Sequence, residues 1–199
     1  MKVLTNSSEN QAGMQLKTIL NHVQKFKSFV YTTIRFATVA DEVVLEVEVQ
    51  PRSNGRPVCS VCSREGPGYD RLPARHFEFV PLWGIKVFLV YAPRRVDCPI
   101  CGVRVERMPW AVGKHRLTQA YAWFLARWAK RLSWKEVAEV FSTSWDTVFR
   151  SVEMAVTWGR AHRDLSGVGA IGIDEVAQAI QSGNVTMPTG ILYGSHRSF

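Results

Sequence analysis

The stretches "VCSVCS" (residues 58–63) and "DCPICG" (residues 97–102) decide the fold, because they contain all four cysteines of this 199-residue chain. Each cysteine belongs to a C-x-x-C pair, whose tight turn aims both sulfurs at one ion. Pro99 and Gly102 favour that turn in the second pair. The first pair lacks these aids and has Ser60, Val61 and Ser63 instead.

Two such turns supply a tetrahedral set of four thiolates, which predicts a structural zinc ion without an open coordination position. Four unrelated thiols would not show the doubled spacing. A rubredoxin-like iron site uses the same spacing and stays open as an alternative. The predicted ligands are Cys59, Cys62, Cys98 and Cys101.

Residues 30 to about 110 are predicted to be β-rich. "VYTTIRFATV" (30–39) and "VVLEVEVQ" (43–50) form a pair of strands, the second with the alternation of a half-buried strand. "RHFEFV" (75–80) and "IKVFLVY" (85–91) form a hairpin around "PLWG", which we expect to bring the cysteine pairs together. With a short helix within 14–29, we predict an N-terminal lead-in over 1–50 and a zinc ribbon over 51–112.

An all-α helix-turn-helix domain is predicted over 113–162. Apolar residues from Leu117 to Leu132 follow one helical face, whereas Trp123 lies on the other side and either stacks on a ligand or packs under a neighbouring element. In "SWKEVAEVFSTSWDTVFR" (133–150), Ser133 and Glu136 form a capping box and Ser144 can cap a second helix. The predicted inward residues are Val137, Ala138, Val140 and Phe141, then Val148, Val152, Ala155 and Val156.

The second helix is predicted to end at Gly159. Ser142 stands where such turns usually carry glycine, and serine adopts a left-handed backbone less readily. Any pair of packed helices would show the same apolar spacing, so the pattern alone leaves a plain helical hairpin open.

Charge favours a polyanionic partner. Lys plus Arg exceed Asp plus Glu by 8, and the stretch from Arg94 to Lys135 has ten bases but only two acids. Such a block suits the phosphates of DNA or RNA, although a solubilising basic surface would look alike. Arg150 could read guanine, and Asp146 could either accept from cytosine or cap the helix. The predicted contacts are Asp146, Thr147 and Arg150 to bases, and Thr143, Ser144, Lys130, Arg131 and Lys135 to phosphates.

The order of "CSVC", "RRVDCPICG", this helical hairpin and "IGIDEV" (171–176) resembles bacterial insertion-sequence transposases of the ISL-three family, over roughly residues 30–178. The resemblance implies a zinc ribbon and a helix-turn-helix that recognise double-stranded DNA at terminal inverted repeats. It implies an RNase-H-like core beyond them, with three acids that bind Mg²⁺, and matches Asp174 to the first acid and the four cysteines to the zinc ligands. It also implies a bacterial cytoplasmic protein associated with the nucleoid.

The sequence departs from that family after Gln178. Only 25 residues follow Asp174, residues 179–199 contain no Asp or Glu, and Glu175 would point to the opposite face of a strand. We therefore expect 163–199 to hold an incomplete first core strand and a divergent tail. The expected protein is a truncated transposase that binds DNA without transposition chemistry of its own, as a homo-oligomer or with the intact enzyme.

Two other functions stay open: an enzyme that receives its missing acids from another chain, and a zinc-ribbon transcription regulator. Composition excludes other classes. The apolar share of 46% is that of a globular protein, no apolar run reaches membrane-spanning length, and the first residues lack the apolar segment of a signal peptide. The predicted fold class is α+β, with a β-rich zinc ribbon, an all-α helix-turn-helix domain and an incomplete RNase-H-like strand, in a reducing cytoplasm.

Overall fold

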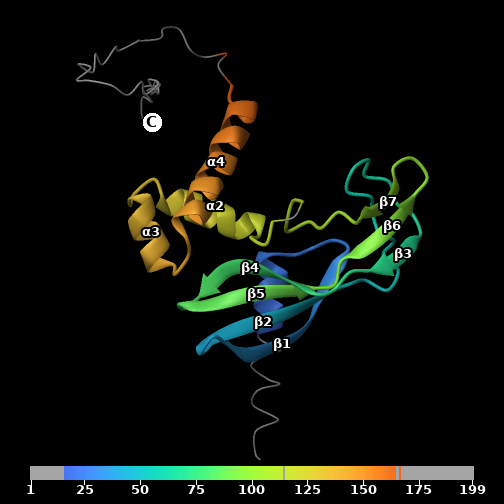
Figure 1. Ribbon diagram of the computed structural model, residues 1–199, viewed down its shortest axis with the longest axis horizontal. Helices are drawn as coiled ribbons and strands as arrows, with labels where there is room; N and C mark the ends of the chain where they lie inside the picture. The colour runs from blue at the N-terminus through green and yellow to red at the C-terminus, as the bar shows by residue number, and fades with distance from the viewer. Residues whose placement is uncertain (1–15, 114, 165, 167–199) are drawn as a thin grey trace, which may run out of the picture. The chain divides into compact units, whose positions relative to one another are not determined.

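The computed structural model describes residues 16–113, 115–164 and 166 (Figure 1). Two sheets and several helices make up these residues, which confirms the predicted α+β class. The chain divides into two units at residues 158 and 159, and the first unit contains both sheets. The predictions for Asp174, for Glu175 and for an incomplete RNase-H-like strand lie outside the described residues.

The larger sheet has four strands in the order β1-β2-β5-β4. Strands β1 (Phe29–Val39) and β2 (Glu42–Pro51) pair antiparallel, as predicted. Strands β4 (Arg75–Leu82) and β5 (Ile85–Tyr91) also form the predicted hairpin, whose turn places Trp83 and Gly84 at φ of 49° and 82°.

The role predicted for that hairpin is wrong. Strand β5 pairs parallel with β2, so the hairpin completes the larger sheet instead of joining the cysteine pairs. The reason is burial: the pairing sets Val87 and Leu89 beside Leu45 and Val47 on one apolar face. The sheet therefore includes strands on both sides of residue 50.

Trp110 is at the centre of the core under this face. Its ring lies 4.9–6.0 Å from the rings of Phe26, Phe29, Phe77 and Tyr91, measured between centroids. A short helix lies within the predicted span, over the described residues 16–23, and adds further apolar side chains to this core. The hydroxyl of Tyr31 donates to the carbonyl of Gln24 at 2.6 Å and thereby ties the chain after this helix to β1.

The smaller sheet is a separate three-stranded element, in the order β3-β6-β7 (Figure 1). Its strands are β3 (Gly68–Arg71), β6 (Arg94–Cys98) and β7 (Gly102–Val105), and both pairings are antiparallel. The second cysteine pair forms the turn between β6 and β7. Isolated bridges of Val58 with Glu65 and of Cys59 with Glu106 hold the first pair beside it.

Three labelled helices follow: α2 (Gln119–Trp128), α3 (Trp134–Val140) and α4 (Trp145–His162). They share an apolar cluster of Tyr121, Leu125, Val137, Ala138 and Val148. Among the described residues, no helix is long and apolar enough to cross a membrane.

Some details of the helical prediction are wrong. Val140 and Val156 are 63% and 51% exposed: Val140 is the last residue of the seven-residue α3, and Val156 lies in the second half of the 18-residue α4. The second helix also continues past Gly159 to His162. A glycine in a helix interior lowers the stability of the helix by only about 1 kcal/mol relative to alanine. This cost is not enough to end the helix.

Candidate metal centre and nucleic-acid interface

The four cysteine sulfurs converge on one point, as the spacing predicts. All four Sγ atoms lie within 4.8 Å of one another, and Cys62 and Cys98 are 3.4 Å apart. None forms a disulfide. A tetrahedral ion with metal–sulfur bonds of about 2.3 Å needs sulfurs about 3.8 Å apart. The cluster can therefore hold a metal ion with only small shifts of the side chains.

The two cysteine turns have the same backbone geometry although their sequences differ. Gly102 follows the second pair at φ 68°, and Ser63 follows the first pair at φ 60°. The amide of Ser63 donates to the carbonyl of Cys59 at 3.0 Å and closes its turn. A serine in the left-handed region costs about 1 kcal/mol relative to glycine, so the first turn is the more strained.

Backbone amides prepare two of the sulfurs for the thiolate form. The amides of Cys101 and Ile100 lower the pKa of Cys98 to about 7. Those of Cys62 and Val61 lower the pKa of Cys59.

Burial raises the pKa of Cys101 to about 12, and the neighbouring sulfurs add to this effect. Thiolates this close together repel one another, and a divalent ion between them reverses that repulsion. The donor set thus fits a soft or borderline dication.

A buried ion pair that the sequence did not reveal connects the smaller, cysteine-bearing sheet to the larger sheet. Glu106 is 2% exposed and accepts from the Tyr91 hydroxyl, from the Arg94 amide at 2.7 Å and from Arg94 Nε and Nη2 at 2.9 and 2.7 Å. Arg94 Nη1 donates to the carbonyl of Gly55 at 3.0 Å. The basic block contains only two acids, and Glu106 is one of them. An acid among so many bases was the feature of the sequence that could have predicted this ion pair.

The helical turn adopts the geometry of a complete helix C-cap. Ser142 has φ 47°, its amide donates to Glu139 O at 3.2 Å, and the amide of Thr143 donates to Ala138 O at 2.9 Å. These are the two hydrogen bonds of a Schellman motif, with serine at the position that favours glycine. The predicted capping box of Ser133 and Glu136 is confirmed as well.

The predicted base-contacting residues lie together at the start of α4. Ser144 caps this helix, because its Oγ accepts from the amide of Thr147 at 3.1 Å, and the two hydroxyls lie 2.8 Å apart. Asp146 and Arg150 are both exposed and form an ion pair, with 2.9 Å between Oδ2 and Nε. Asp146 therefore has Arg150 as its partner in the free chain.

The predicted phosphate contacts Lys130, Arg131 and Lys135 are exposed, and Lys135 lies 4.0 Å from Glu139. The basic block is partly neutralised, because Arg94 pairs with Glu106 and Arg95 with Asp70. Apart from the contact of Lys135 with Glu139, the other described bases of the block form no ion pair with a described residue.

Aromatic residues near the start of α4 were not anticipated as a group. Trp134, Trp145 and Phe149 have ring centroids 5.5–5.6 Å apart, and Trp145 stays 52% exposed. The available signal was a tryptophan at the first position of each of two helices, with Phe149 one turn after the second. Trp123 contacts the ring of Trp158 at 5.4 Å, in agreement with the packed alternative for this residue.

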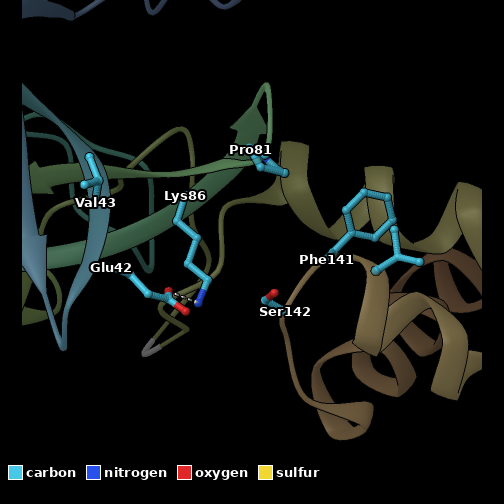
Figure 2. A pocket seen from close by; sticks show the side chains of 8 residues that line it. Glu42, Val43, Pro81, Lys86, Phe141 and Ser142 are labelled. Carbon is cyan, nitrogen blue, oxygen red and sulfur yellow. Dashed lines mark hydrogen bonds and ion pairs between the residues drawn. The ribbon is translucent and has the colours of Figure 1, made fainter.

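A shallow hollow of about 290 Å³ lies between the ends of β2 and β5 and the turn after α3 (Figure 2). Glu42 and Lys86 form an ion pair of 2.8 Å beside it, and Ser142 lies across from them. The two charges neutralise each other, and Val43, Pro81 and Phe141 supply the apolar part of the lining.

The chain is similar to two transposases. The proteins are the "Transposase for insertion sequence element IS1557" of Mycobacterium tuberculosis strains CDC 1551 / Oshkosh and ATCC 25618 / H37Rv. Each is 31% identical over 135 residues, which is 65% of this chain but 30% of the relative. No protein-family model matches the chain, and no solved structure matches it. The similarity supports a role connected with transposition, and the matched region spans less than a third of those relatives.

Proposed function

We propose that this chain provides the DNA-reading part of an insertion-sequence transposase of the ISL-three family. In this proposal the four cysteines hold a structural zinc ion, and α3 and α4 bind the terminal inverted repeats of the element. Helix α4 enters the major groove with its first turns. The observation that carries the proposal is the start of α4, where Asp146, Thr147 and Arg150 line one groove together with Arg116 of the basic block.

The Asp146–Arg150 pair supports a reading role for Arg150. Asp146 approaches the Nε atom, so the two Nη groups can donate together to O6 and N7 of guanine. Asp146 then acts as a positioning residue, because it limits the rotamers of the guanidinium before DNA arrives. This role replaces a direct contact of Asp146 with cytosine.

Selection of bound duplexes from a random pool, with the zinc-loaded chain, tests the proposal. Enrichment of a sequence present in the inverted repeats is expected, with affinity that falls steeply as salt rises. Enrichment of an unrelated operator sequence would favour a transcription regulator. Absence of any binding to duplex DNA would refute the proposal.

Arg150→Ala should relax the preference at one base pair by about 1–3 kcal/mol while other positions keep theirs. Arg150→Lys is the matched variant, since it keeps the charge but loses the two parallel donors. Unchanged discrimination in Arg150→Ala would reject α4 as the reading helix.

Recognition, and not strand transfer, is proposed for the described residues. Strand transfer by two Mg²⁺ ions needs several carboxylates at one site, and among the described residues the only group of three or more candidate metal ligands is the four cysteines. We expect no Mg²⁺-dependent nicking of repeat DNA by this chain. Nicking that Asp174→Asn abolishes would contradict that expectation. Association with an intact transposase on the same DNA ends is part of the proposal.

A further inference from the structure

The start of α4 lines a groove of about 340 Å³ whose other side belongs to the larger sheet and to the segment before α2. Its polar lining includes Asp146, Thr147 and Arg150 from α4, His76 from β4, and His115 and Arg116 from that segment. Thr147 and Arg150, which are proposed to read bases, thus share this groove with the positioning residue Asp146. Three separate parts of the chain supply basic side chains to it.

Main-chain hydrogen bonds hold the segment before α2 against β4. The amide of Glu78 donates to Arg116 O at 2.7 Å, and the amide of Thr118 donates to Glu78 O at 2.9 Å. The Thr118 hydroxyl, which is fully buried, donates to the same carbonyl at 2.9 Å. These bonds fix the backbone of Arg116 independently of its side chain, so the groove is built before any ligand arrives.

The charges in the groove suit an anion. Arg116 is exposed and forms no ion pair with a described residue. The negative charge of Asp146 is engaged by Arg150, and His76 lies 3.0 Å from Glu46. Burial raises the pKa of Glu78, with Lys86 opposing it in part, so this carboxyl opposes an anion less than an exposed one would.

We propose that this groove receives one phosphodiester strand of the duplex that α4 reads, with Arg116 and His115 in contact with its phosphates. The inference rests on the proposed function and adds a contact surface outside the helical hairpin. A helix in the major groove lies between two sugar–phosphate strands. The side of the groove that lies opposite α4 must therefore contact the sugar–phosphate strand on that side.

The test compares Arg116→Gln with Arg127→Gln in the full, zinc-loaded chain. Both variants remove one exposed arginine of the basic block, but Arg127 is on α2 and does not line the groove. Arg116→Gln should weaken binding to the selected duplex roughly fivefold to tenfold near 0.1 M salt and reduce the salt slope by about 1. The loss should be equal for specific and unrelated duplexes. Arg127→Gln should change the affinity less than twofold.

Ethylation interference gives a readout that net charge alone would not change. Ethylation of one or two phosphates should reduce the binding of the unmodified chain and of Arg127→Gln. The same ethylation should not reduce the binding of Arg116→Gln. Equal losses in both variants, or no loss in Arg116→Gln, would overturn the inference. The inference would also be overturned if Arg116→Gln lost affinity only for single-stranded DNA, whose bases would then stack on Phe88 of the groove. If Arg150→Ala still relaxes specificity in these cases, the proposed function stands; if no variant and no parent chain binds duplex DNA, it fails as well.

Discussion

Two serines occupy left-handed backbone positions at which glycine is more stable. Ser63 ends the first cysteine turn and Ser142 ends α3. In both places the amide of the serine donates a hydrogen bond that closes the turn, so the surrounding structure determines the conformation. The strain of a Cβ atom in this region is therefore retained in the folded chain.

Ser142→Gly should raise the free energy of unfolding by about 1 kcal/mol, because it removes the Cβ strain and keeps both Schellman hydrogen bonds. Urea denaturation of the zinc-loaded chain measures the change. Ser142→Ala is the matched control and should give no gain, since it keeps the Cβ atom. An equal gain in both variants would show that the backbone conformation is not the cause.

Among the described glycines, Gly66 has the closest atoms around the position of an added methyl group. A Cβ atom there would lie 2.8 Å from the carbonyl oxygen of Asp97 and 2.9 Å from Val96 Cγ1, next to the metal-binding turns. Gly66→Ala should destabilise the chain by about 1–3 kcal/mol through this overlap. Gly68→Ala is the control, since nothing lies within 4 Å of its Cβ. Competition for zinc with a chelator should show faster metal loss in Gly66→Ala alone, and equal loss in both would contradict the prediction.

At the scale of elements, Thr118 connects α2 to β4. Its Oγ1 accepts from the amide of Tyr121 and caps α2, while its hydroxyl and amide both donate to the carbonyl of Glu78. Thr118 is therefore a buried residue whose hydrogen bonds join the larger sheet to the start of the helices. The apolar cluster of the helices also includes Val80 of β4 at its margin.

Thr118→Val should lower the free energy of unfolding by about 1–2 kcal/mol, since the cap and one buried hydrogen bond are lost at nearly constant volume. Thr118→Ser keeps the hydroxyl and should retain most of the stability. Thermal unfolding followed by circular dichroism measures both. Equal losses in the two variants would indicate that the methyl group, and not the hydroxyl, holds α2 in place.

At the scale of the whole molecule, Glu106 couples the smaller, cysteine-bearing sheet to the larger sheet. It joins Tyr91 at the end of β5, Arg94 at the start of β6 and, through the bridge with Cys59, the first cysteine turn. Loss of this carboxylate would leave Arg94 half-buried without its counter-charge. Such a loss affects the metal site and the sheet together.

Glu106→Gln should destabilise the chain by about 3–5 kcal/mol and weaken zinc retention, because the buried Arg94 loses its partner. Asp70→Asn removes the partner of Arg95 at the surface and should change the stability little. Denaturation with and without zinc separates the two effects. Equal stability of the two variants would show that the buried pair does not hold the sheets together.

Local signals in the sequence were sufficient for several features. The cysteine spacing predicted the four-thiol cluster, the S-x-x-E pattern predicted the cap of α3, and the alternation of residues 43–50 predicted β2. These signals depend on residues a few positions apart, whose geometry the backbone itself limits.

Only the tertiary structure decided which distant segments meet. It set β5 parallel to β2, paired Glu106 with Arg94, and placed Arg116 and His76 around the groove at the start of α4. Many pairings of apolar strands and charged side chains satisfy the same local pattern. The choice among them depends on how complete faces pack and which charges are buried together, which no short stretch of this sequence contains.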